Sequence, residues 1–150
     1  KWQLDNLEGD SDDLTWANIL VNSNYPLFME EFYPVIKNRG AIIICNEMAD
    51  LTKHSWIKHD FRIGNNAFSN LDPITTIKEY IAKNNIQNEL FLFSASSFSN
   101  VAQYELHKEY PNNTYIDIGT TLSYEIGIPS RRGYLEQYYS NQNVTGNCIW

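Results

Sequence analysis

The clearest pattern in this chain is one unbroken apolar run, followed further along by three segments with weaker or shorter strand patterns. Ala41-Ile42-Ile43-Ile44-Cys45 is rich in β-branched residues. It predicts a strand over residues 41–45 that is covered on both faces, as in a parallel sheet. Further strands are expected over residues 57–63, 90–93 and 114–118.

Apolar residues at helical spacing lie before and between these runs. Residues 14–21 predict a short helix. A second helix is expected after Asn24, which can cap it, with Pro26 in its first turn and Pro34 kinking or shortening it. The expected buried stripe of this second helix consists of Phe28, Phe32, Val35 and Ile36.

Three more helices are expected in the second half of the chain. Asp72 can cap the first of them, with Pro73 at its first position and Asn84-Asn85 at its end. Ser96 or Ser97 can cap the next helix, and residues 134–139 predict the last one. The expected apolar faces are Ile74, Ile77 and Ile81 on the first, and Phe98, Val101, Ala102 and Leu106 on the second.

Strands that alternate with helices are typical of βαβ units. We therefore expect an α/β fold: a Rossmann-like three-layer sandwich with a mostly parallel sheet of about four or more strands. The 150 residues are the usual size of one domain, and no linker divides them. Residues 1–150 are accordingly predicted to form a single domain.

Charge and composition restrict the partners. Eleven Lys and Arg stand against eighteen Asp and Glu, which gives a net charge of −7. Because no basic stripe is present, a nucleic-acid partner is not expected. No apolar run reaches the ~20 residues that cross a bilayer. The two cysteines, Cys45 and Cys148, form no disulfide framework, so a reducing, cytoplasmic location is expected.

Small, polar and acidic residues follow each of the four predicted strands. In open α/β sheets, ligands bind outside the carboxyl ends of the strands, so these residues predict a site at one edge of the sheet. The four segments are Cys45-Asn46-Glu47, Ile63-Gly64-Asn65-Asn66, Ser94-Ala95-Ser96-Ser97 and Asp117-Ile118-Gly119-Thr120.

Asp117 stands near the end of an Ile-rich strand, where an acid is costly unless it is paired or used. It could bind a metal, orient a sugar hydroxyl or act as a base. Alternatively, it caps the following turn. Gly119-Thr120-Thr121 could present backbone N–H groups to a phosphate.

Two charged motifs have two readings each. Arg132, in the pair Arg131-Arg132, could neutralise a diphosphate, or the pair could lie in a solvated loop. Asp10 and Asp12 have the D-x-D spacing with which many nucleotide-sugar transferases hold a divalent cation. They could equally be an acid cluster at the start of a helix.

Three short motifs within residues 62–125 point to a family. They are Arg62-Ile63-Gly64-Asn65-Asn66-Ala67-Phe68, Leu90-Phe91-Leu92-Phe93-Ser94-Ala95-Ser96 and Thr114-Tyr115-Ile116-Asp117-Ile118-Gly119-Thr120. Together they resemble the glycosyltransferases of the GT-D fold, which occur in bacteria and, as related proteins, in large algal viruses. Ser130-Arg131-Arg132-Gly133-Tyr134 is similar to that family's Arg-x-Tyr-type ending.

The resemblance implies transfer of a sugar from a nucleotide-sugar donor to a hydroxyl acceptor on a glycan, usually with Mn²⁺ or Mg²⁺. Asp117 matches the acid of the family's Ile-Asp-Ile-Gly segment. Asn65 and Asn66 match its Asn-containing loop. In a viral member, the cytoplasm would be that of the host.

The chain departs from the family pattern in two places. The acidic metal motif of the Arg-x-Gly-Asp-Gly-Glu kind is absent, so the chain is expected to be a fragment that lacks it. In addition, Ser123 stands where related sequences often carry an Asp, and Glu125 is the expected substitute.

The leading hypothesis is therefore a glycosyltransferase. The alternatives are a non-catalytic Rossmann-like module that binds a nucleotide or a partner, and a methyltransferase, which would normally show a Gly-rich loop after its first strand. On the leading hypothesis, Asp117 and Glu125 are catalytic and Asp10 and Asp12 bind the metal. The donor is expected to bind Asn46, Gly64, Asn65, Asn66, Ser94, Ser96, Gly119, Thr120 and Arg132.

Overall fold

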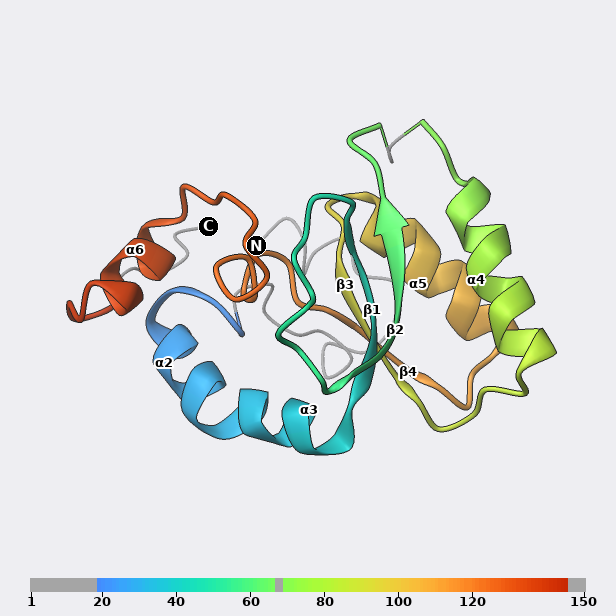
Figure 1. Cartoon of the computed structure of the whole chain (residues 1–150), viewed down its shortest axis with the longest axis horizontal. Coiled ribbons are helices and arrows are strands. Elements are labelled where there is room, and N and C mark those ends of the chain that lie inside the picture. Colours follow the sequence, from blue (N-terminus) through green and yellow to red (C-terminus); the bar gives the residue numbers. More distant parts are fainter. Residues whose placement is uncertain (1–18, 67–68, 146–150) are drawn as a thin grey trace, which may run out of the picture.

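The computed structural model describes residues 19–66 and 69–145 (Figure 1). Its centre is a four-stranded sheet in the order β2-β1-β3-β4, in which every neighbouring pair is parallel. The strands are β1 (Ala41–Asn46), β2 (Ile57–Ile63), β3 (Leu90–Ser94) and β4 (Thr114–Asp117). The four predicted strands and the predicted parallel sheet are thereby confirmed.

Both faces of the sheet are covered, as the run of β-branched residues in β1 predicted. Ile42 and Ile44 pack into a core with α4 (Asp72–Lys83) and α5 (Phe98–Glu109). Ile43 and Cys45 point to the opposite core, which contains the helical arm over residues 22–39, residues 118–128 and α6 (Gly133–Tyr139). Figure 1 shows the resulting three layers, with the sheet between the two groups of helices.

The helical arm consists of η2 (Asn22–Asn24), α2 (Tyr25–Leu27), the π-helical turn η3 (Phe28–Phe32) and α3 (Tyr33–Arg39). Pro34 does not end the helix, because it lies in the first turn of α3, where a missing N–H costs little. Of the helix expected over residues 14–21, residues 14–18 lie outside the described part, and residues 19–21 form a turn and a bend.

The prediction that Val35 belongs to the buried stripe was wrong, since its side chain is 59% exposed. The cause is the π-helical turn, in which the N–H of Tyr33 bonds to the carbonyl of Phe28, five residues back. One extra residue in the turn rotates the following helix. Tyr33 and Ile36 therefore face the core after Phe28.

Two smaller expectations about α4 and α5 also need correction. Val101 is 44% exposed, because the buried stripe of α5 repeats every four residues and Val101 lies at its margin. Asp72 is the first residue of α4 rather than its cap, and its N–H is satisfied by Oδ1 of Asn70 at 2.9 Å. Ser97 occupies the cap position of α5 without a side-chain capping bond.

Tyr25 joins the helical arm to the C-terminal part of the described chain. Its side chain is 0% exposed, and its hydroxyl donates to the carbonyl of Thr121 at 2.8 Å. Its ring centroid lies 4.9 Å from that of Tyr134 and 5.1 Å from that of Tyr138. Burial raises the pKa of Tyr25, so the hydroxyl stays a donor.

We expect Tyr25→Phe to lower the free energy of unfolding by about 1–3 kcal/mol, because the buried carbonyl of Thr121 would lose its partner. Urea denaturation should show a lower midpoint with an unchanged slope. Tyr104→Phe is the matched control, since Tyr104 is 66% exposed, and its midpoint should equal that of the wild type. Equal midpoints for both variants would contradict the role of Tyr25.

None of the helices that the structure describes is long and apolar enough to cross a bilayer.

Candidate functional site

The order of the sheet reverses between β1 and β3. The connection from β1 to β2, residues 47–56, packs with Ala49 and Trp56 into the core of the helical arm. The connections that follow β2 and β3 run through α4 and α5 on the other face. Chains that leave neighbouring strands on opposite faces open a crevice at their carboxyl ends, which is where α/β proteins usually bind ligands.

A polar pocket of about 220 Å³ lies at this point. We call it the switch-point pocket. It is lined by Asn46, Ile63, Gly64, Asn65, Ser94, Ala95, Ser96 and Ser97. Five of the residues that the sequence assigned to donor binding therefore share one pocket, and they come from the ends of three different strands.

Asn46 and Asn65 connect the ends of β1 and β2. The amide Nδ2 of Asn46 donates to Oδ1 of Asn65 at 3.1 Å, and Oδ1 of Asn46 accepts the N–H of Met48 at 2.9 Å. Both ends of the Asn46 amide are thereby engaged. Nδ2 of Asn65 takes part in neither bond and remains available as a donor to a ligand.

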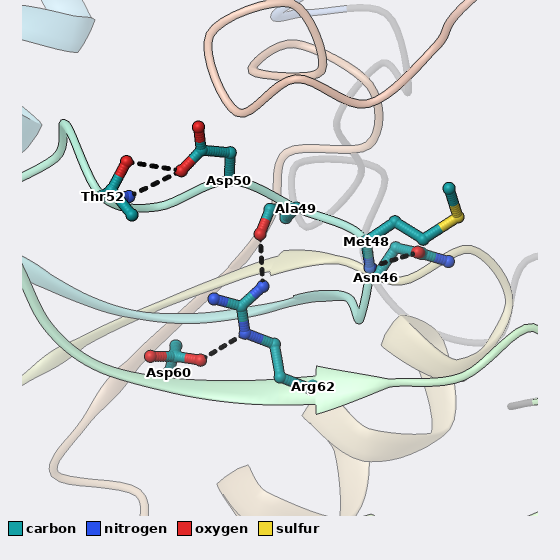
Figure 2. A network of polar contacts seen from close by, with 7 residues as sticks. All are labelled: Asn46, Met48, Ala49, Asp50, Thr52, Asp60 and Arg62. Atoms are coloured by element: carbon teal, nitrogen blue, oxygen red, sulfur yellow. Dashed lines mark hydrogen bonds and ion pairs between the residues drawn. The ribbon is translucent and has the colours of Figure 1, made fainter.

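The loop after β1 is fixed in place by Arg62, as Figure 2 shows. The Arg62 guanidinium donates to the carbonyl of Ala49 at 2.6 Å and pairs with Asp60 on the same strand. A further backbone bond of 2.8 Å joins the N–H of Asp50 to Ile126. The wall of the pocket that carries Asn46 is thus bonded both to β2 and to residues 118–128.

The wall of the pocket after β3 consists of three serines and Ala95. Ser94 Oγ donates to the carbonyl of Gly119 at 2.7 Å, which joins the end of β3 to the end of β4. Ser96 has a φ of 53°, in the left-handed region that non-glycine residues seldom occupy. Such conformations are concentrated at ligand sites, where the surrounding structure enforces them.

Asp117 does not line the switch-point pocket. It lines a neighbouring apolar groove of about 900 Å³ between β4 and the helical arm, together with Gly119. Its Oδ1 accepts the N–H of Gly119 at 2.9 Å, so the carboxylate caps the turn, the alternative considered from the sequence. Partial desolvation raises the pKa of Asp117, and the bond from Gly119 partly offsets this effect.

The turn after β4 has fewer free N–H groups than a phosphate cradle needs. The N–H of Gly119 bonds to Asp117, and that of Thr121 bonds to the carbonyl of Ile118 at 3.0 Å. The Thr120 hydroxyl lies 2.8 Å from that of Tyr134. Burial raises the pKa of Tyr134, and the bond with Thr120 and the charge of Arg132, at the start of α6, partly offset this effect.

Glu125 is bonded to residues other than those around Asp117. Its carboxylate accepts the hydroxyl of Tyr139 at 2.6 Å, and its backbone carbonyl lies 2.8 Å from Nε2 of His54. Burial is the main cause of the raised pKa of Tyr139, and the bond to Glu125 adds to it. These contacts place Glu125 at the exposed margin of the tyrosine cluster that contains Tyr25 and Tyr139.

The remaining predicted residues lie outside the pocket or outside the described chain. Asn66 follows the pocket residue Asn65, and its carbonyl accepts the N–H of Ser69 at 2.9 Å. Asp10 and Asp12 precede residue 19 and are outside the described residues.

Glu47 belongs to the strand-end segment Cys45-Asn46-Glu47 that the sequence selected, but it was not among the residues assigned to catalysis, donor binding or metal binding. It directly follows Asn46, and its carboxylate oxygens lie 3.7 and 3.8 Å from the place that a Cβ on Gly64 would take. The carboxylate is thus at the margin of the switch-point pocket. Its place directly after a buried strand is the signal that had selected its segment.

Mn²⁺ and Mg²⁺ prefer oxygen ligands, and Mg²⁺ at nucleotide sites often uses one or two carboxylates together with substrate phosphates. Residues 19–66 and 69–145 hold no group of three or more His, Cys, Asp and Glu side chains that could bind a metal by themselves. Glu47 is the carboxylate beside the pocket. A cation there would therefore need ligands from the donor.

No family model, no curated protein and no solved structure matches this chain. The family resemblance therefore rests on the sequence motifs alone.

Proposed function

We propose that this chain is a glycosyltransferase domain that binds a nucleotide-sugar donor at the carboxyl ends of its parallel strands. The observation that carries the proposal is the switch-point pocket. It brings together Asn46, Gly64, Asn65, Ser94 and Ser96, which the strand-end rule and the family resemblance select from the sequence. Amide and hydroxyl groups of this kind suit the many hydroxyls of a nucleotide sugar.

On this proposal, the sugar leaves its diphosphate while an acceptor hydroxyl attacks the anomeric carbon. Arg132 would stabilise the departing diphosphate through charge-assisted hydrogen bonds. Asp117 would orient the acceptor hydroxyl or take its proton. Between the two predicted carboxylates, Asp117 is favoured, because the carboxylate of Glu125 is already bonded to Tyr139.

A divalent cation would neutralise charge on the diphosphate when bound. Asp10 and Asp12 stay predicted ligands.

The second candidate is a binding module without chemistry. It is favoured by one observation: the carboxylate of Asp117 lies at the apolar groove and caps its own turn. Such a module would bind a nucleotide sugar or its parts at the switch-point pocket and release them unchanged.

Thermal unfolding with UDP-, GDP- and dTDP-sugars, each with and without Mn²⁺, tests the proposal. A ligand at about 100 times its Kd stabilises by about 2.7 kcal/mol. For a domain of this size, that corresponds to a rise in Tm of roughly 5–10 °C. Transfer to a glycan acceptor with the stabilising donor supports the enzyme, whereas binding without transfer supports the module.

Arg132→Ala distinguishes a donor role from a general loss of structure in the same assay. The variant should keep the wild-type Tm without ligand, because Arg132 stands at the exposed start of α6. It should lose most of the rise caused by the donor. Lys83→Ala, which removes another exposed cation, is the matched control for charge. The absence of a rise with any donor would contradict the proposed function.

A further inference from the structure

The switch-point pocket is polar, but none of the eight residues that line it carries a charge. A phosphate bound there would have no Lys or Arg lining residue, and the nearby carboxylate of Glu47 would repel it. A neutral, hydroxyl-rich group needs no cationic partner and is not repelled by the carboxylate of Glu47. The pocket is therefore suited to the uncharged part of a ligand.

Glu47 provides a carboxylate at the margin of the pocket, where it could accept hydrogen bonds from the hydroxyls of such a ligand group. Gly64 lines the pocket and has no side chain, and both carboxylate oxygens of Glu47 lie at ordinary contact distance from the place that a Cβ on Gly64 would take. No side-chain hydrogen bond or ion pair occupies this carboxylate among the described residues, whereas Asp60, Glu89 and Glu109 are all paired with cations. An unpaired carboxylate beside a polar pocket is a strong acceptor without a protein donor.

We propose that Glu47 binds a vicinal diol in the switch-point pocket, with one carboxylate oxygen for each hydroxyl. The donors and acceptors complement one another. Glu47 accepts from both hydroxyls, and Nδ2 of Asn65 and the Ser96 hydroxyl donate to the hydroxyl oxygens. The inference deepens the proposed function, on which it rests, by naming the ligand group that this pocket selects.

A vicinal diol could come from the ribose of a nucleotide or from a hexose. The two sources share the chemistry that Glu47 would recognise. Two matched pairs of ligands separate them: uridine against 2′-deoxyuridine, and methyl α-glucoside against its 3-deoxy analogue. In each pair, only the first compound retains the diol at the changed position.

Titrations of the full chain by NMR, with EDTA present to exclude a bridging cation, measure the effect. At least one pair should show a diol preference of about 10-fold or more in Kd, the size expected for a hydrogen bond to a charged acceptor. Glu47→Gln should abolish that preference. Glu79→Gln is the matched control, because Glu79 is exposed on α4, and it should retain the preference.

Two results would overturn the inference: equal binding within both pairs, or a preference that survives Glu47→Gln. The thermal unfolding assay with nucleotide-sugar donors distinguishes a failure of this inference from a failure of the proposed function. Stabilisation by a donor without any effect of Glu47→Gln on diol preference refutes only the role of Glu47. A Glu47-dependent preference without stabilisation by any donor supports the diol site and refutes the glycosyltransferase.

Discussion

Ile43→Asp is expected to prevent this domain from folding. Ile43 lies in the middle of β1, is 0% exposed and faces the core of the helical arm. The substitution removes a large apolar side chain and places a carboxylate among apolar neighbours. An unpaired buried charge costs several kcal/mol, and the lost packing adds to it. The total approaches the 5–15 kcal/mol by which a typical domain is stable.

Circular dichroism and thermal unfolding would detect the loss, since the variant should show no cooperative transition. Val35→Asp is an informative control. The spacing of apolar residues predicts a buried Val35 as well, but in the structure Val35 is exposed. That variant should fold and melt near the wild-type temperature. A folded Ile43→Asp protein would refute the central position of β1.

The strands could be predicted from sequence because their signal is local and strong. Ile42, Ile43 and Ile44 are consecutive and β-branched, which favours a strand, and a strand between two cores buries all three. The site followed from the same signal, because the polar residues after parallel strands must share one edge of the sheet. That argument needs no knowledge of which strands are neighbours.

The strand order is what the sequence did not reveal, and it decides which candidates meet. With the order β2-β1-β3-β4, the ends of β1, β2 and β3 form the pocket, and β4 stands beyond β3. Asp117 therefore lies at a different cavity from Asn46 and Asn65. The exposure of Val35 could not be predicted either, because nothing in the local spacing of apolar residues marks the π-helical turn.

Asp117→Asn has the largest effect expected on catalysis. If Asp117 takes a proton from the acceptor hydroxyl, its amide replacement should lower kcat by about 10²–10⁴-fold, the usual contribution of a general base. The fold should persist, because Oδ1 of an asparagine can still accept the N–H of Gly119. Transfer assays with the stabilising donor measure the first effect, and Tm measures the second.

The pH dependence of stability provides an independent test of the environment of Asp117. Its raised pKa means that the folded state holds the proton more tightly than the unfolded state does. Below the ordinary titration range of aspartate, both states are protonated and the carboxyl costs nothing. As the pH rises through that range and beyond the raised pKa, ionisation destabilises the folded chain. Asp117→Asn should remove this penalty, so its Tm should equal or exceed that of the wild type at neutral pH.

Asp117→Ala separates catalysis from capping, since it removes both the carboxylate and the acceptor for Gly119. It should lose activity as the asparagine variant does, and it should also lose some stability. Wild-type turnover in the asparagine variant, together with destabilisation in the alanine variant, would leave Asp117 as a turn cap alone. Because the carboxylate lies at the groove and not at the switch-point pocket, an acceptor bound in that groove is what its catalytic role requires.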